Sequence, residues 1–276
     1  MLFKQVVTTL IASLKAWVRP GLEYAPDGWN TALPSSRASG WNSGGVVSSE
    51  MAKWEAFCDN LRGTGPLGFS HEHGDLSEVR NVSFHNIHVS YAYVLALAAH
   101  KKDVLRVLDW GGGLGHYYLL GKAVLPNVKL DFHCKEMQGI ADCGRKLNPE
   151  VRWHTEDECL SRTYDLVMIN GSLQYMPNWK DMLVKMAASV DAGGYLFLTR
   201  LPIVETSGSF VAIQRAYGTR MLHGQFNKEE VLRILEGASL VLLREFVVGD
   251  RPRIKRAPEQ CELRGYLFRQ TNGEKG

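Results

Sequence analysis

The segment VLRVLDWGGGLGHYYLL, residues 104–120, decides the fold of this chain. It reads as an apolar strand that ends in Asp109, a glycine-rich turn, and a helix that begins at His116. The glycines of the turn are Gly111, Gly112, Gly113 and Gly115. Glycine has no Cβ, so such a turn tolerates positive φ and lets backbone approach a ligand closely. Because the following helix directs its free N–H groups and positive dipole end at that ligand, the segment predicts a nucleotide-binding corner.

The spacing of these glycines narrows the choice of nucleotide. Dinucleotide sites use G-x-G-x-x-G, whereas the sixth position counted from Gly111 is His116. The pattern from Asp109 to Gly115 is D-x-G-x-G-x-G. It resembles motif I of class I S-adenosylmethionine-dependent methyltransferases. The resemblance implies that Asp109 and the four glycines belong to a binding site for S-adenosyl-L-methionine.

Strand-like and helix-like segments alternate after residue 104. Strands are expected at 104–110, 128–134, 151–155, 164–170 and 195–201, and helices at 116–125, 137–147, 178–190 and 228–236. Residues 191–194 are expected to form a turn, and 240–248 and 261–269 a terminal antiparallel pair. Repeated βα units predict an α/β fold: a Rossmann-like, doubly wound, mostly parallel sheet that binds ligands beyond the carboxyl ends of its strands.

The first 100 residues predict an N-terminal, mainly helical cap, and residues 101–276 the cofactor-binding catalytic domain. Residues 1–18 are expected to form an amphipathic helix that packs on its own domain or meets a membrane surface or a partner. Residues 21–50, with Trp29 and Trp41, read as an ordered loop that could cover the ligand as a lid. Helices are expected at 47–63 and at 83–100, the second capped by Ser83 or Asn86.

Acidic residues follow the second and third strands. Glu136 comes about twenty residues after the glycines, the usual position of an acid that binds ribose, and Met137 follows it. A carboxylate there can accept hydrogen bonds from both ribose hydroxyls. Asp157 is the candidate for receiving the amine of adenine, although its acidic run equally fits a solvated loop.

The segment after the fourth strand should reach the methyl donor and the acceptor. Its first residues are Asn170, Gly171 and Ser172. Small residues permit close approach there, while Gln174 and Tyr175 supply polar groups. Arg200, at the end of the fifth strand, is expected to hold an anionic acceptor or to form an internal ion pair.

A hydroxyl acceptor needs a general base. The candidate catalytic residues are His85, His88, Tyr175 and His223. His85 and His88 are spaced i, i+3, near His71 and His73, but no cysteine or acid completes a metal-ligand pattern. We therefore predict no metal site.

Composition excludes several classes of protein. The chain of 276 residues is 45% hydrophobic and 22% charged, as in ordinary globular proteins, and its net charge of +3 does not indicate nucleic-acid binding. The basic run at 251–256 reads as a solvated loop. The five cysteines form no C-x-x-C pair, which favours a reducing, cytoplasmic location. No apolar run reaches the ~18–20 residues of a membrane span, and no signal peptide is evident.

Downstream segments extend the resemblance. GSLQYM at 171–176, LTRLP at 198–202 and Gln214 resemble a sequence-defined group of class I methyltransferases associated with polysaccharide and O-antigen biosynthesis regions. The likeness covers roughly residues 29–246. It implies methyl transfer to a small-molecule or glycan acceptor, with oxygen as the expected methylated atom. Two alternatives stay open: a non-catalytic, cofactor-binding scaffold of the same fold, and an NAD-dependent oxidoreductase, against which the missing third glycine counts. The sequence leaves the oligomeric state unknown.

Overall fold

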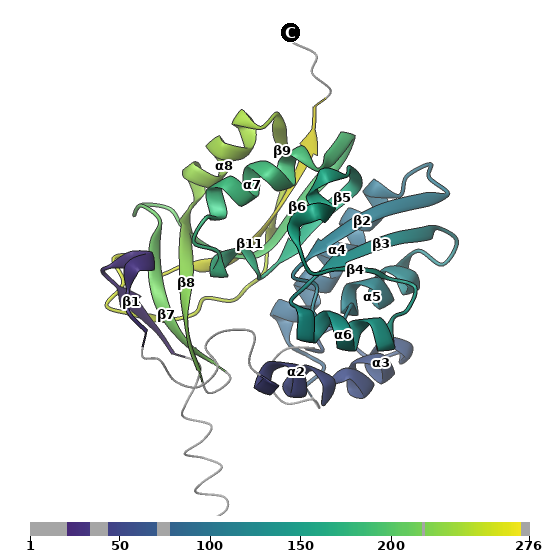
Figure 1. Cartoon of the computed structure of the whole chain (residues 1–276), viewed down its shortest axis with the longest axis horizontal. Coiled ribbons are helices and arrows are strands. Elements are labelled where there is room, and N and C mark those ends of the chain that lie inside the picture. Colours follow the sequence, from purple (N-terminus) through teal and green to yellow (C-terminus); the bar gives the residue numbers. More distant parts are fainter. Residues whose placement is uncertain (1–20, 34–43, 71–77, 217–218, 272–276) are drawn as a thin grey trace, which may run out of the picture.

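A mostly parallel sheet with helices on both faces forms the centre of the molecule (Figure 1). The computed structural model describes residues 21–33, 44–70, 78–216 and 219–271. The parallel strands run in the order β4-β3-β2-β5-β6, and β11 adds antiparallel to β6, with β9 beyond it. This arrangement confirms the predicted Rossmann-like sheet. The expected helix at 1–18, and Trp41, His71 and His73, lie outside the described residues.

The elements of this layered core follow the predicted alternation. Its strands are β2 (Val104–Trp110), β3 (Lys129–Lys135), β4 (Arg152–His154), β5 (Tyr164–Asn170), β6 (Val190–Val204), β9 (Leu240–Val247) and β11 (Glu262–Gln270). Its helices are α4 (Val82–Ala98), α5 (His116–Val124), α6 (Gln138–Leu147), α7 (Trp179–Ala188) and α8 (Lys228–Gly237), with the 3-10 helices η3 (Asp157–Ser161) and η4 (Leu173–Tyr175). Two further helices are α2 (Gly44–Met51) and α3 (Trp54–Arg62).

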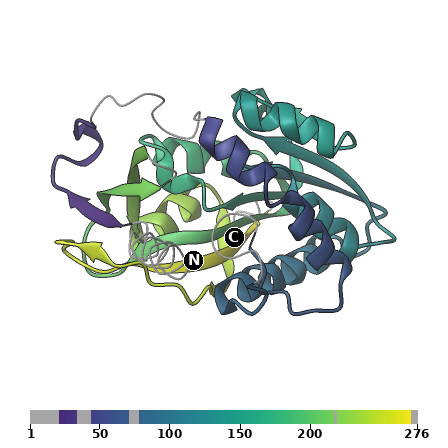
Figure 2. The ribbon, with the colours of Figure 1, turned by 90° about the horizontal axis from the view of Figure 1, so that it is seen from below.

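Each face of the sheet has its own apolar core. All seven residues of β5 are buried, as expected for a strand covered on both sides. Leu183 of α7 and Leu235 of α8 pack on one face. Tyr91 and Leu95 of α4 pack on the other, together with α5 (Figure 2). Although α4 precedes residue 100, it shares its core with β2; the division of the chain at residue 100 stays a prediction.

A second group of strands extends from the end of β6, and the sequence did not predict it. β7 (Phe210–Ala216) and β8 (Thr219–Asn227) form an antiparallel pair, β1 (Leu22–Ala25) adds to β7, and β10 (Ile254–Lys255) adds to β1. The 3-10 helix η1 (Gly28–Asn30) follows β1. β8 joins the group to the central sheet, since it runs parallel to the last residues of β6. Part of the expected 21–50 loop is therefore a strand.

Three local predictions are wrong. The helix expected at 47–63 is broken, because the N–H of Lys53 donates to the carbonyl of Glu50 and tightens the turn between α2 and α3. Asn81, not Ser83 or Asn86, caps α4, and its side chain accepts from the N–H of Phe84 at 3.1 Å.

The third error is the turn expected at 191–194, which belongs to β6. A Cβ at Gly194 would lie 3.0 Å from the carbonyl oxygen of Asp165, so glycine lets this strand run close to β5. The strand is irregular there, with a register shift opposite Tyr164 and a φ of 72° at Gly193.

Within the described residues, no helix combines the length and apolar character needed to cross a bilayer.

Candidate active site

The loop between β2 and α5 has the backbone geometry that its glycines predict. Gly111, Gly113 and Gly115 have φ of 74°, 58° and 88°, a region in which other residues are strained. A Cβ at Gly112 would lie 2.3 Å from a carboxylate oxygen of Asp109. Gly115 precedes the first turn of α5, which has no side-chain cap. The N–H groups of that turn are therefore oriented toward the carboxyl edge of the sheet.

Asp109 lies underneath this loop. Its side chain is fully buried, and neither carboxylate oxygen has a hydrogen-bond partner in the described part of the chain. Burial, and then the negative charge of Glu136, raise the pKa of Asp109 to about 8. Asp109 supports the loop from behind, at Gly112. Its contribution to the cofactor site stays a prediction.

Glu136 connects the carboxyl ends of β2 and β3. The N–H of Gly113 donates to Oε1 at 3.3 Å, and the N–H of Met137 donates to Oε2 at 2.6 Å. Burial raises the pKa of Glu136, and the two N–H groups oppose that shift. The carboxylate therefore stands beside the glycine loop, where the sequence predicted an acid for ribose. Its contact with ribose stays a prediction.

Asp157 is more remote from the loop. It starts η3 with a side chain that is 54% exposed, and its nearest cation, Lys135 Nζ, lies 4.0 Å away. Lys135 also lies over the ring of Trp110, with Nζ 4.5 Å from its centre. This exposure fits the alternative of a solvated loop, and the adenine contact of Asp157 stays a prediction.

The end of β5 meets the glycine loop, and its predicted contact with the methyl donor and the acceptor stays a prediction. Ser172 Oγ donates to the carbonyl of Trp110 at 2.8 Å, and a Cβ at Gly111 would lie 2.5 Å from the Cβ of Ser172. Asn170 is buried, and its amide donates to the hydroxyl of Tyr117. The structure therefore brings Asn170, Gly171 and Ser172 to the same edge as Gly111.

Arg200 of β6 lies over Gly171. Gly171 has a φ of 68°, and a Cβ there would lie 3.2 Å from a guanidinium nitrogen of Arg200. Arg200 itself has a φ of 57° and packs near Phe84 of α4, 6.0 Å from the ring centre. A non-glycine residue in this conformation is uncommon. The bend aims the guanidinium at the carboxyl end of β5.

Tyr175 and His223 come together beside this edge. The Tyr175 hydroxyl donates to Gln214 Oε1 at 2.8 Å, and its ring meets the His223 ring edge to face, with centres 5.3 Å apart. Tyr175 ends η4, which packs on β8. Two of the four predicted catalytic residues are therefore neighbours.

The structure argues against His223 as the general base. Burial, and then the positive charge of Arg200, lower the pKa of His223 to about 3. Gln225 Nε2 donates to His223 Nδ1 at 2.7 Å and also lies 3.3 Å from the His223 carbonyl, which only an N–H can approach as a donor. Nδ1 therefore accepts, and the proton of the neutral ring sits on Nε2. His223 is set up as a hydrogen-bond donor.

His85 and His88 differ in burial and in the contacts of their side chains. His88 is buried, its Nδ1 lies 2.7 Å from the carbonyl of Leu67, and its ring packs against Phe69. These contacts give it a structural position and count against its use as a base. His85 lies on the exposed side of α4.

Sequence reasoning missed Glu50. This residue of α2 is 6% exposed, and its Oε2 would lie 3.1 Å from a Cβ at Gly113. An acid thus reaches the glycine loop from a distant part of the sequence. No local sequence pattern marks Glu50, because its burial and the direction of its side chain follow from tertiary packing.

Comparisons with known proteins agree with this geometry. A family model described as a methyltransferase domain matches residues 85–237, more than half of the chain. No curated protein matches. Among solved structures, a candidate sarcosine dimethylglycine methyltransferase from Galdieria sulphuraria has a TM-score of 0.51 and 12% identity, covering 81% of this chain and 98% of that one.

Two more distant structures are also similar. An amino pentose methyltransferase from Micromonospora echinaspora, involved in calicheamicin biosynthesis and bound to S-adenosylmethionine, has a TM-score of 0.47 and 18% identity over 68% of this chain and 91% of its own. An S-adenosylmethionine-dependent methyltransferase from Clostridium acetobutylicum has a TM-score of 0.45 and 13% identity over 66% of this chain and 90% of its own. At such identities these likenesses concern the fold alone.

Proposed function

The chain belongs to the methyltransferase domain family and is an S-adenosylmethionine-dependent methyltransferase; from that premise, we propose that it methylates a hydroxyl group of a small-molecule or glycan acceptor. The observation that carries the proposal is the meeting of three strand ends. The glycine loop, Glu136 and Gly171–Ser172 lie at one edge of the sheet. In open α/β sheets this is the edge at which ligands bind.

The residues present fit S-adenosylmethionine. Glu136 offers a carboxylate for the ribose hydroxyls, and the uncapped first turn of α5 offers N–H groups for the carboxylate of the methionine moiety. Gly111 and Gly171 let Ser172 and Arg200 pack against the loop and the end of β5, because a Cβ at either glycine would collide with those side chains. The cofactor supplies an electrophilic methyl group on a sulfonium. The protein therefore needs to position the two reactants and exclude water.

The acceptor is proposed to lie against η4 and β8. Arg200 lies over Gly171. Tyr175 ends η4 and contacts the ring of His223, whose Nε2–H provides a donor for an acceptor oxygen. Because the nitrogen of His223 is protonated there, it can orient a hydroxyl and does not deprotonate it. Tyr175 and His85 remain the proposed bases for a hydroxyl acceptor.

The glycan part of the proposal rests on the GSLQYM and LTRLP segments, whose resemblance is to methyltransferases of polysaccharide regions. We further propose a cytoplasmic location, from cysteine usage, and no role in nucleic-acid binding, from the small net charge.

Calorimetry tests the cofactor half of this proposal. S-adenosylmethionine should bind the wild-type chain, and Glu136→Ala should weaken binding by about 1–3 kcal/mol, because charge-assisted hydrogen bonds are lost. Glu158→Ala is the control, since Glu158 is an exposed acid on η3. Equal affinity in wild type and Glu136→Ala would overturn the ribose assignment.

Radiolabelled methyl transfer tests the catalytic half. A panel of hydroxylated small molecules and oligosaccharides should include at least one acceptor that gains label, and NMR of the product should place the new methyl group on an oxygen. Cofactor binding without transfer to any acceptor in the panel would favour the scaffold alternative.

A further inference from the structure

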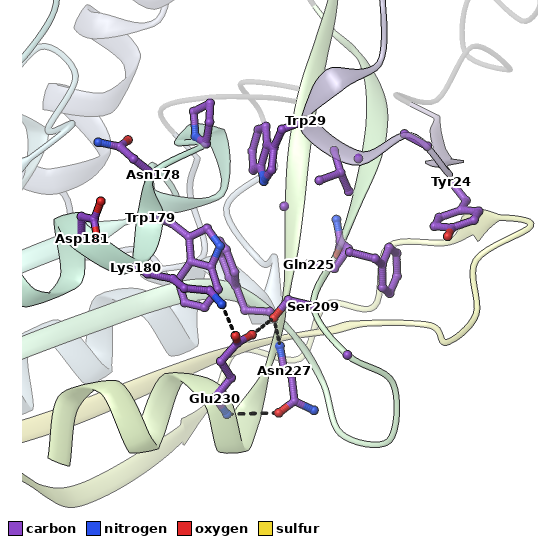
Figure 3. Close-up of a pocket in the computed structure, with 18 of the residues that line it drawn as sticks. Tyr24, Trp29, Asn178, Trp179, Lys180, Asp181, Ser209, Gln225, Asn227 and Glu230 are labelled. Atoms are coloured by element: carbon purple, nitrogen blue, oxygen red, sulfur yellow. Dashed lines mark hydrogen bonds and ion pairs between the residues drawn. The ribbon is translucent and has the colours of Figure 1, made fainter. Parts of the chain in front are cut away.

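A cavity of about 770 Å³ lies next to the acceptor side of the site (Figure 3). It is enclosed by η1, the start of α7, the start of α8, and strands β7 and β8. Its volume falls within the about 300–1,000 Å³ that is typical of small-molecule sites. None of the residues assigned above to the cofactor lines it.

The cavity adjoins the site through a chain of contacts. Pro177 and Asn178 line it and follow Tyr175 by two and three residues. Gln225 lines it too, and donates to His223, whose ring touches Tyr175. The cavity therefore borders the segment that follows η4 and the residue that bonds to His223. Part of an acceptor held there would lie beside the proposed acceptor residues.

Aromatic rings form its apolar walls. Figure 3 shows Trp29 and Trp179 on one side of the space and Gln225 on the other. Trp29 is partly exposed and reaches the strand at Gly224, where a Cβ would lie 3.2 Å from the indole. Glycine at this position thus lets the indole pack against β8. At the far end, the rings of Tyr24 and Phe210 meet edge to face at 5.6 Å.

Polar groups form the floor of the cavity, and hydrogen bonds and an ion pair among them hold them in place without a ligand. Ser209 Oγ donates to Glu230 Oε2 at 2.5 Å, and Lys180 pairs with the same carboxylate. Asn227 caps α8 by accepting from the N–H of Glu230 at 3.1 Å. A carboxylate has about four acceptor positions, so Glu230 keeps capacity for ligand hydroxyls. An ordered floor reduces the entropy lost on binding.

The charges around the cavity balance. Its charged lining residues are Lys180, Arg233, Asp181 and Glu230. Two are cationic and two are anionic, so the cavity offers no excess charge to an ionic ligand. Asn178 adds a neutral amide, whose side chain makes no hydrogen bond to the described part of the chain. The lining therefore suits an uncharged ligand with apolar faces and many hydroxyl groups at its edges.

We propose that this cavity binds an uncharged sugar ring of the methyl acceptor, with the ring stacked on Trp29 and its hydroxyls directed at Glu230 and Asn178. The proposal rests on the methyltransferase function proposed above and names the class of its substrate. A pyranose has C–H faces that pack on an indole and a polar rim that matches the ordered floor. A flat aromatic ring would fill the walls but would not use the remaining acceptor positions of Glu230 or the amide of Asn178.

Saturation-transfer NMR on the full chain tests the proposal. The probes are methyl α-glycosides of glucose, galactose and rhamnose, with indole for comparison. At least one glycoside should bind, and Trp29→Ala should weaken it tenfold or more, which is about 1.4 kcal/mol. Asn178→Ala should weaken it a few-fold, without removing any contact within the described fold. Tyr93→Ala is the control, because Tyr93 is an exposed aromatic residue on α4, outside the cavity.

Three results would overturn the proposal: no glycoside binds, glycosides bind Trp29→Ala as tightly as wild type, or indole binds while the glycosides do not. Calorimetry with S-adenosylmethionine on the same variants separates this inference from the proposed function. Cofactor affinity should be equal in wild type and Trp29→Ala. Sugar binding in a chain that fails to bind the cofactor would contradict the methyltransferase assignment and leave a sugar site.

Discussion

Two regions of this molecule are built in opposite ways. The donor half comprises β2, α5, β3 and α6, with α4 packed against them; its strands come from consecutive βα units. The acceptor half comprises β1, η1, β7, β8 and β10. There, Leu22 pairs with Gln214 and with Ile254, so the strands join segments about 190–230 positions apart in the sequence. The cofactor side is thus local in sequence, and the acceptor side is not.

The glycines show the same difference. In the donor half, a Cβ at Gly112 would lie 2.3 Å from Asp109, and one at Gly144 would lie 2.2 Å from Trp153. In the acceptor half, a Cβ at Gly28 or Gly208 would meet no atom within 4 Å. Gly112 and Gly144 therefore have no room for a side chain, whereas Gly208, in the loop before β7, faces open space. The acceptor half is not loose throughout, because a Cβ at Gly224 of β8 would lie 3.0 Å from the Phe226 ring.

The largest effect should come from filling the donor loop. Gly112→Ala places a methyl group against Asp109 and Cys134, which are both buried, so the loop must shift. We expect the free energy of unfolding to fall by about 2–3 kcal/mol, and cofactor affinity to fall with it. Gly208→Ala is the matched control and should change stability by less than about 0.5 kcal/mol. Urea unfolding measures both. Equal losses of unfolding free energy in the two variants would contradict the difference between the two halves.

A second test uses the buried carboxyl group of the donor half. The pKa of Asp109 is raised from 3.8 to about 8, so the folded state keeps a proton that the unfolded state releases. The free energy of unfolding should therefore fall as pH rises from about 4 to about 8, by on the order of 3 kcal/mol between pH 5.5 and 8.5. Asp109→Asn should remove most of this slope.

Glu136 has a raised pKa as well, so its smaller contribution, of the same sign, should persist in Asp109→Asn. Urea unfolding of both proteins at the two pH values gives the comparison. If wild type and Asp109→Asn showed the same slope, Asp109 would be ionised in the folded chain, and the loop would need a different account.

The donor half could be predicted from sequence because its signals are local. The strand before Asp109, the alternate glycines and Glu136 lie in a short stretch, and their order fixes where they meet. Asp109 shows the limit of this reasoning. Its position was predicted correctly, but only the packing of Gly112 shows that its carboxyl group faces the interior.

The acceptor half could not be predicted because its pairing is long-range. Nothing near Leu22 in the sequence indicates Gln214 as its partner. Likewise, the proton position on His223 depends on Gln225, two residues away on the same face of β8. That i, i+2 relation becomes visible only once 219–227 is known to be a strand, and no strand was predicted there.

The smallest expected effects come from removing one hydroxyl group in each half. Tyr91→Phe deletes a buried hydroxyl that donates to the carbonyl of Tyr117 at 3.0 Å, where water has no access to replace it. Tyr175→Phe deletes a hydroxyl that donates to Gln214, which is partly exposed and can bond to water instead. We expect losses in the free energy of unfolding of about 1–2 kcal/mol for the first and below about 1 kcal/mol for the second.

The same two substitutions should affect different functional quantities, namely cofactor affinity and the kinetics of the acceptor. Tyr175 contacts His223 and Gln214 and is a proposed general base, so Tyr175→Phe should leave S-adenosylmethionine affinity unchanged and lower kcat by about 100-fold or more. Tyr91 packs against α5, so Tyr91→Phe should weaken binding of the cofactor and leave the KM for the acceptor unchanged. Calorimetry and steady-state kinetics measure the two. If Tyr175→Phe changed cofactor affinity as much as Tyr91→Phe did, the two halves would form one coupled site. The loss of the Tyr175 hydroxyl would then act through η4 on Ser172 and the glycine loop.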